Sequence, residues 1–241
     1  MTHARSVVVN GDLGSGKSTV SRLLADRLGV RRVSIGDLYR EMAQQRGMTA
    51  LELNLHAELD DKVDHYVDQL QADIATSGET LIVDSRLAWH FFQTALKVHL
   101  ITDPVVAAYR VLGRPADQVE GYDSMRDAQR RLAARSESER VRFIERYGAD
   151  KTDLRNYDLV CDTTRATPDE VVATITDALA EPSPQLRLFV DPRRVHAGSD
   201  DGTAAVRVAY REGMFTTVSG SRTVRDAVRD GRTLLAAVLV D

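Results

Sequence analysis

Short apolar runs alternate with longer amphipathic stretches over roughly the first 180 residues of the chain. The runs are brief, rich in Val, Ile and Leu, and they lie at residues 7–9, 31–35, 80–85, 97–102 and 157–163. Strand signals that alternate with helical patterns are typical of a parallel sheet with crossover helices. The pattern therefore predicts an α/β fold with five candidate strands.

Helix signals lie between and after these runs. Thr49-x-x-Glu52 has the form of a capping box, and an apolar face with helical spacing follows it, formed by Val63, Tyr66, Val67, Leu70 and Ile74. A second capping box begins at Thr167, with proline at the first helical position. Between them, residues 124–147 are rich in arginine and glutamate, and they predict one long helix.

The first apolar run leads into a glycine-rich turn and then into a helical pattern, in VVVNGDLGSGKSTVSRLLADRLG (7–29). Residues 11–18 match G-x-x-x-x-G-K-[ST] at every fixed position, in the strand–loop–helix context that this pattern requires. Glycines let successive backbone N–H groups point at phosphate oxygens, and a helix N-terminus adds its positive end. We therefore predict a nucleoside triphosphate site formed by Gly11, Gly14, Ser15, Gly16, Lys17, Ser18 and Thr19.

Two residues of this loop have separate expected roles. Lys17 would bridge the β- and γ-phosphates of ATP, and the Ser18 hydroxyl would ligate Mg²⁺, with Thr19 behind it. The loop alone does not name a reaction, because ATPases, GTPases and kinases all share it.

Composition narrows the class of protein. The 241-residue chain has 43% hydrophobic and 28% charged residues, which is ordinary for a globular protein with a sizeable core. Its formal net charge of −4 argues against broad nucleic-acid binding by the whole chain. Cys161 is the one cysteine, and its place in an apolar run predicts a buried strand residue.

No apolar run approaches the about 20 residues of a membrane span, and residues 1–6 lack the apolar region of a signal peptide, so we expect a cytoplasmic protein.

Polar residues follow the second and third apolar runs. After the second, VSIGDLYREM places Ser34, Asp37 and Arg40 on a turn into a helix. After the third, IVDSRLAWH places Asp84 at a strand end and Arg86 two residues later. Ligands of such sheets lie at the carboxyl ends of the strands, so we expect these side chains to form an acceptor site across a crevice from the triphosphate loop.

Five segments occur in one order: GDLGSGKST, VSIGDLYREMAQQRGMT, IVDSRLAW, RSESERVRFIERYG and NYDLVCDTTRATPDEVV. In this order they resemble the cytidylate kinase family, in particular its shorter archaeal-type and actinobacterial members, over roughly residues 5 to 180. The resemblance implies the P-loop nucleoside monophosphate kinase fold, with a five-stranded parallel core, flanking helices, a substrate-binding insertion after the second strand and a mobile lid that bears arginines. It also implies transfer of a phosphoryl group from ATP to CMP or dCMP, with Mg²⁺.

The resemblance implies roles for particular residues as well. The residues assigned to the acceptor are Ser34, Asp37, Arg40 and Arg86. Those assigned to Mg²⁺ are Ser18 and Asp84. Those assigned to catalysis are Lys17, Arg86, Arg135 and Arg140. Of these, Arg135 and Arg140 would neutralise charge on the transferring phosphoryl group. No general base is required, because phosphoryl transfer depends mostly on positioning and electrostatics.

Several of these assignments have alternatives. Arg40 could pair with an acidic neighbour on its own helix, and Asp84 could cap the helix that follows it. Arg135 is spaced to form an ion pair with Glu139 on one face of the long helix.

Two departures from the family pattern leave a second class of function open. This chain has Asp84-Ser85-Arg86 where family members commonly have Glu-Gly-Arg or Asp-Gly-Arg, and Arg114 stands where a denser basic cluster is often found. The alternative to a kinase is a regulatory module that binds ATP, turns it over slowly, and engages a partner or DNA through its tail.

The last part of the chain follows a different pattern. Two prolines within EPSPQ (181–185) predict a linker between a first domain, residues 1–180, and a small α+β extension, residues 186–241. LRLFVDPRRVHAGSDD is expected to form a strand and a turn, and TVRDAVRDGRTLLAAVLVD a strand or turn followed by an apolar helix. These segments resemble parts of a ParB-like domain; the alternative is a docking subdomain without chemistry. We expect a monomer that binds nucleotides, with nucleic acid only through this extension.

Overall fold

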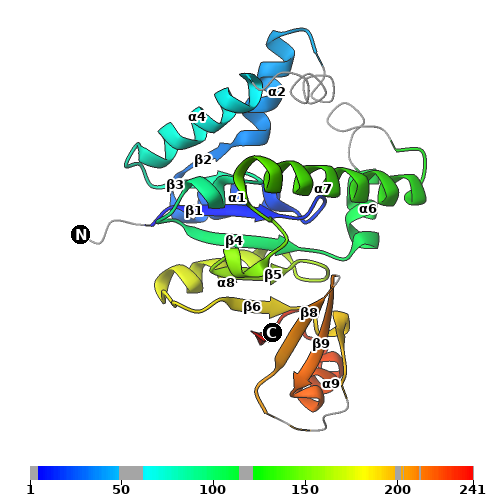
Figure 1. Cartoon of the computed structure of the whole chain (residues 1–241). Coiled ribbons are helices and arrows are strands. Elements are labelled where there is room, and N and C mark those ends of the chain that lie inside the picture. The colour runs from blue at the N-terminus through cyan, green and yellow to red at the C-terminus, as the bar shows by residue number, and fades with distance from the viewer. Residues whose placement is uncertain are drawn as a thin grey trace.

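Five parallel strands form the centre of the molecule, in the order β2-β3-β1-β4-β5 (Figure 1). They are β1 (Val7–Gly11), β2 (Arg31–Ser34), β3 (Leu81–Asp84), β4 (Leu96–Ile101) and β5 (Leu159–Asp162). The structure is a computed structural model that describes residues 5–48, 62–113, 122–198, 202, 204–211 and 213–240. The predicted parallel sheet is confirmed, whereas the predicted capping box at Thr49 and the position of Arg114 lie outside the described residues.

Alternate residues of β1 pack into two different apolar cores, because successive side chains of a strand point to opposite faces of the sheet. Val7 and Val9 pack into a core that includes residues of α1 (Lys17–Leu28) and α8 (Pro168–Ala180). Val8 packs into the core on the other face, which includes residues of α5 (Ala88–Phe91) and α7 (Met125–Tyr147). The sheet is therefore a middle layer with helices on both faces.

The remaining helices connect successive strands of this sheet. Helices α2 and α4 follow β2 and precede β3, which is where the family resemblance places a substrate-binding insertion. The bounds of the remaining elements of this part are α2 (Ile35–Gln45), α4 (Lys62–Thr76), α6 (Pro104–Leu112) and the 3-10 turn η1 (Leu154–Asn156). None of the described helices combines the length and the hydrophobicity needed to cross a bilayer.

Local sequence signals account for two helix starts and one buried strand. The Ser124 hydroxyl accepts a hydrogen bond from the Asp127 amide at the start of α7, and Thr167 and Glu170 form the predicted capping box of α8. These side chains satisfy backbone donors that the first helical turn leaves unpaired. Cys161 is fully buried in β5, as its apolar surroundings predict.

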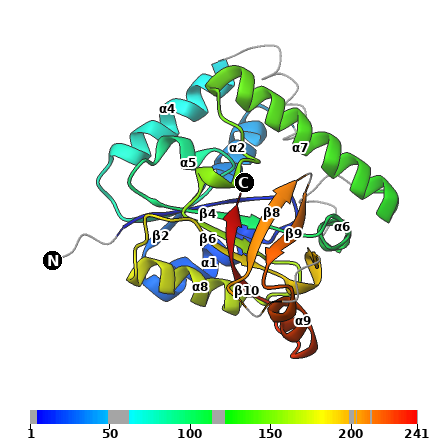
Figure 2. The same cartoon turned by 60° about the horizontal axis from the view of Figure 1, so that its bottom comes forward.

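The C-terminal extension continues the same sheet (Figure 2). Its first strand, β6 (Arg187–Val190), pairs in parallel with β5, and its last strand, β10 (Leu235–Val240), pairs antiparallel with β6. Beyond β10 the order is β8-β9-β7, so the described residues form one sheet of ten strands. The other elements are η2 (Pro192–Arg194), β7 (Val195–His196), β8 (Arg207–Arg211), β9 (Met214–Ser219) and α9 (Ser221–Arg229).

The end of the extension differs from its sequence prediction. A strand or turn followed by an apolar helix was expected, but the helix α9 comes first and the apolar segment is the strand β10. In β10 the buried positions alternate, with Leu235 and Ala237 inside. Pairing with β6 on one side and β8 on the other determines this conformation, and neither neighbour is adjacent in sequence.

Candidate active site

The loop between β1 and α1 has the backbone geometry that its glycines allow. Gly16 caps α1 with a φ of 86°, in the left-handed region that side chains disfavour. Gly11 lies directly beside β4, where a Cβ atom would come within 2.3 Å of the Leu100 carbonyl oxygen. In the loop (residues 11–18, hereafter the P-loop), the positive φ therefore favours glycine at position 16, whereas position 11 has no room for a side chain.

Lys17 is held by the P-loop itself. Its Nζ donates to the carbonyl oxygens of Gly11 and Asp12, at 2.7 and 2.8 Å. Burial lowers the pKa of Lys17 to about 8, and the nearby Asp84 carboxylate opposes this decrease. Lys17 is thus a partly desolvated cation whose carbonyl partners can be exchanged for phosphate oxygens.

The other predicted triphosphate residues lie around Lys17. Ser15 is buried and its hydroxyl donates to the Asp12 carbonyl oxygen at 2.8 Å, which tightens the turn. Ser18 and Thr19 are exposed on the first turn of α1. Their hydroxyls are therefore accessible at the helix N-terminus, where partial positive charge accumulates.

Asp84 lies at the end of β3 and is nearly buried. Its Oδ2 accepts hydrogen bonds from Arg32 at 2.7 Å and from Ser21 at 3.4 Å. In the turn that leads into α5, the Ser85 Oγ accepts from the Leu87 and Ala88 amides. Asp84 is therefore not the cap of the following helix, and Ser85 is integrated into the turn where the family commonly has glycine.

Four charged side chains form a cluster above the carboxyl end of the sheet. Glu139 of α7, with a side chain only 7% exposed, pairs with Arg86, with Arg135 at 3.2 Å and with Lys151 at 3.1 Å. Burial alone would raise the pKa of Glu139, but these three cations hold it at about 2. Arg86 and Glu139 also affect the charge state of Lys17, so the cluster and the P-loop belong to one electrostatic site.

Arg40, a predicted phosphate-binding arginine, has an acidic partner of its own. Arg40 is 55% exposed and pairs with Asp37, which also accepts from Arg32 at 3.2 Å. The Ser34 hydroxyl caps α2 by accepting from the Asp37 amide at 3.2 Å. Ser34, Asp37 and Arg40 therefore lie together at the start of α2, connected to Asp84 through Arg32.

Arg140 does not belong to the charge cluster around Glu139. Its guanidinium pairs with Asp150 at 3.1 Å and with Glu137 at 3.1 Å. The structure thus brings Lys17, Asp84, Arg86 and Arg135 together, and it places Arg140 in a separate ion-pair network.

Sequence reasoning missed three cations at this site. Lys151 follows α7 in an irregular segment, and Arg32 lies on β2. Arg110 of α6 donates to the Thr163 carbonyl oxygen at 2.6 Å and to the Gly14 carbonyl oxygen at 3.4 Å. No motif marks Lys151 or Arg110. Arg32 could have been found, because it is two residues before Ser34 on a strand that was predicted to end at the site.

His99 on β4 lies close enough to Lys17 and Lys151 for their charges to affect it. Burial, with smaller effects of Lys17 and Lys151, lowers its pKa to about 3. Its ring stacks on Tyr157, at 4.4 Å between ring centroids. His99 is therefore neutral at ordinary pH and is part of the packing beneath the site.

The sheet order, the glycine-rich loop and the cations around it define a P-loop protein of the kinase class. The family model described as an AAA domain matches residues 7–145. The cytidylate kinase of Natronomonas pharaonis is 39% identical over 175 residues, which are 72% of this chain and 88% of that protein. The cytidylate kinase of Methanobrevibacter smithii is 33% identical over 173 residues, which are 72% of this chain and 97% of that protein. The chain belongs to the cytidylate kinase family.

Solved structures agree on the fold. A shikimate kinase from Bacteroides thetaiotaomicron matches with a TM-score of 0.52 and 15% identity, covering 73% of this chain and 98% of that one. An uncharacterized protein from Eubacterium ventriosum matches with a TM-score of 0.57 and 15% identity, covering 73% of this chain and 99% of that one. The predicted P-loop kinase fold is confirmed.

Proposed function

We propose that this protein transfers the γ-phosphoryl group of ATP to CMP or dCMP. The observation that carries the proposal is the charge cluster beside the P-loop, in which Arg86, Arg135 and Lys151 all pair with the buried Glu139 carboxylate. Together with Lys17 these groups bring several cations into a partly desolvated site. Phosphate groups of a donor and an acceptor carry the negative charge that such a site binds.

Each side chain has a distinct task in this scheme. Lys17 moves from its backbone carbonyl partners to the β- and γ-phosphates, and Arg135 neutralises charge that develops on the transferring oxygens. Arg86 holds the α-phosphate of the monophosphate, and Arg40, with Ser34 and Asp37 at the start of α2, lies on the acceptor side. Catalysis then consists of positioning and electrostatic stabilisation.

The donor set near the P-loop also fits Mg²⁺, which prefers carboxylate, hydroxyl and phosphate oxygens. Among the described residues, both partners of the Asp84 carboxylate bind Oδ2, so Oδ1 is left for a cation or its water shell. Asp84 and the exposed Ser18 hydroxyl would hold the ion, which would offset the negative charge of the phosphates. The described residues contain no group of three or more His, Cys, Asp or Glu side chains that could hold a metal alone, which suits an ion bound partly by substrate.

A panel of acceptors tests the proposal. ADP formation is measured with ATP, Mg²⁺ and each of CMP, dCMP, UMP, AMP and GMP in turn, and the largest kcat/KM is expected for CMP or dCMP. Absence of ADP formation with CMP, dCMP and UMP alike would overturn the proposal. Slow ATP turnover that no monophosphate changes would favour an ATP-binding regulatory module instead.

The lowered pKa of Lys17 predicts a pH dependence for ATP capture. The ammonium form binds phosphate, and in the free enzyme it is lost as the pH rises through about 8. We expect kcat/KM for ATP to fall above that pH, while kcat at saturating ATP falls only at higher pH, because bound triphosphate stabilises the ammonium. Steady-state rates between about pH 6 and about pH 10 measure both profiles. A kcat/KM profile that is flat over this range would contradict the assignment.

A further inference from the structure

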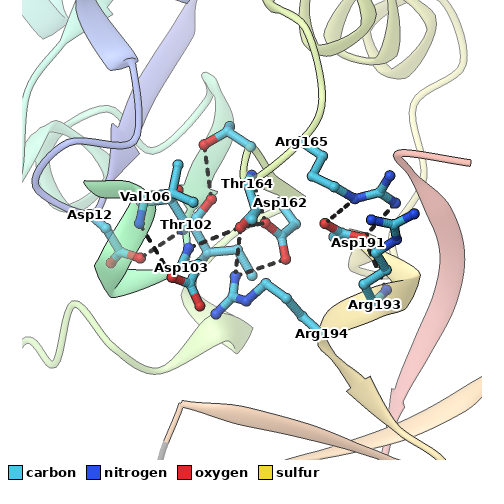
Figure 3. Close-up of polar contacts among 12 residues, drawn as sticks. Asp12, Thr102, Asp103, Val106, Asp162, Thr164, Arg165, Asp191, Arg193 and Arg194 are labelled. Atoms are coloured by element: carbon cyan, nitrogen blue, oxygen red, sulfur yellow. Dashed lines mark hydrogen bonds and ion pairs between the residues drawn. The ribbon is translucent and has the colours of Figure 1, made fainter. Parts of the chain in front are cut away.

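A buried aspartate joins the kinase core to the C-terminal extension (Figure 3). Asp162, at the end of β5, has a side chain 0% exposed. Its Oδ1 accepts from the amide and hydroxyl of Thr164, at 2.9 and 2.6 Å. Its Oδ2 accepts from Arg194, which belongs to η2 of the extension, at 2.8 Å. A buried carboxylate is costly without a cation, so the charge of Arg194 is required for this turn to keep its form.

The same turn holds the P-loop. The Thr163 hydroxyl donates to the Ser15 carbonyl oxygen at 2.9 Å. The Thr163 carbonyl oxygen accepts from Arg110, whose other nitrogen reaches the Gly14 carbonyl oxygen. Two consecutive P-loop residues are therefore connected to residues 162–164 by hydrogen bonds.

The turn also orders the start of α6. The Thr164 hydroxyl accepts from the Asp103 amide at 2.9 Å, and the preceding Thr102 amide donates to the Asp12 carboxylate of the P-loop at 3.1 Å (Figure 3). Burial raises the pKa of Asp12, and Arg194 is one of the cations that oppose this rise. The charge of Arg194 thus also acts electrostatically on Asp12 of the P-loop.

A second ion pair fixes the extension beside this turn. Arg165 donates to both carboxylate oxygens of the buried Asp191, each at 2.8 Å. Asp191 in turn caps η2 by accepting from the Arg193 amide at 3.0 Å. The position of Arg194 is therefore set by β6, by η2 and by a two-point contact with the core (Figure 3).

We propose that Arg194 of the C-terminal extension is a positioning residue for the donor nucleotide, acting through Asp162 and Thr163 on the P-loop. The inference rests on the proposed function, because it assigns ATP to that loop. The match to the family model ends at residue 145, so Asp162, Thr163 and Arg194 lie outside the segment that the model covers. The extension is thereby a working part of the ATP site.

The Arg194→Met substitution tests the inference, with Arg193→Met as the matched control. Arg193 is the neighbouring residue of η2 and its side chain is exposed, whereas the arginine that pairs with Asp162 is Arg194. In Arg194→Met we expect KM for ATP, and the Kd for ATP by calorimetry without acceptor, to rise about tenfold. The KM of Arg194→Met for CMP should change less than about twofold. In Arg193→Met, the KM for ATP, the Kd for ATP and the KM for CMP should all stay within about twofold of the wild-type values.

Two further variants separate positioning from simple stability. Arg194→Lys retains a cation with one donor towards Asp162, so it should recover part of the ATP affinity. Thr163→Val removes the hydroxyl that bonds Ser15 and leaves the ion pair intact, so it should reproduce the increase in Kd for ATP. Thr163→Val also serves as the test if Arg194→Met does not fold. A lowered melting temperature in Arg194→Met with unchanged ATP affinity, or unchanged ATP affinity in Thr163→Val, would overturn the inference.

The experiment distinguishes this inference from the proposed function. If the wild type transfers no phosphate to any monophosphate but Arg194→Met still weakens ATP binding, the function fails and the inference stands. If the wild type is an active kinase and Arg194→Met binds ATP as well as Arg193→Met does, the inference fails and the function stands.

Discussion

Replacing Lys17 with alanine is expected to lower kcat for phosphoryl transfer about a thousandfold or more. Lys17 is the one cation that the P-loop itself supplies, and its present partners are two backbone carbonyl oxygens of that loop. Its charge is directed at oxygens that become more negative as the phosphoryl group leaves ADP, so its loss raises the barrier by several kcal/mol, about 1.4 kcal/mol for each decade of rate. The measurement is kcat with saturating ATP and CMP.

Lys97→Ala is the matched control for this substitution. Lys97 is a partly buried lysine near the amino end of the central strand β4. The P-loop lies at the other end of the strands, after the carboxyl end of β1. Its removal should leave kcat within about threefold of the wild-type value. Activity of Lys17→Ala within a few-fold of wild type would show that this loop is not the donor site.

The Arg86→Met substitution should raise KM for CMP ten- to a hundredfold. Arg86 follows the buried end of β3, and its guanidinium now pairs with Glu139, which keeps Arg135 and Lys151 when Arg86 is removed. The lost contact to the acceptor phosphate is charge-assisted and can use two N–H groups, so it is worth roughly 1.5 to 3 kcal/mol. The affinity for ATP, measured by calorimetry without acceptor, should be nearly unchanged.

Two comparisons make the Arg86 result specific. Arg86→Lys should restore only part of the CMP affinity, because an ammonium cannot reproduce the planar fork of a guanidinium. Arg131→Met, on an exposed face of α7 where Arg131 pairs with Asp127, should leave both affinities unchanged. Weakened ATP binding with intact CMP binding in Arg86→Met would mean that the donor and acceptor sides are assigned the wrong way round.

The parts of the site that could be predicted are those encoded locally. The β-branched run before Gly11 predicts β1, the glycine spacing predicts the P-loop, and the helix that follows carries Lys17 and Ser18 at its start. Arg86 and Asp84 were found because they follow a short apolar run, and such a run ends at the ligand edge of a parallel sheet. Each of these inferences needs only a few neighbouring residues.

The parts that could not be predicted depend on pairings between distant segments. Asp84 meets Arg32 only because β2 lies beside β3 in the sheet, and Glu139 meets Lys151 only after the chain reverses at the end of α7. The strand β10 was expected to be helical, since its alanines and leucines allow either conformation and β6 and β8 determine the outcome. The ParB-like resemblance of the extension stays a prediction.

The ten-stranded sheet has a consequence for self-association. An open edge strand offers unpaired N–H and C=O groups to another molecule, and long flat edges are hazards for aggregation. Here one outer strand is β2, four residues long with two arginines, and the other is β7, only two residues long. Both edges within the described residues are thus too short or too charged to serve as a ready template for strand addition. A wide sheet is in this way left with little backbone open to intermolecular pairing.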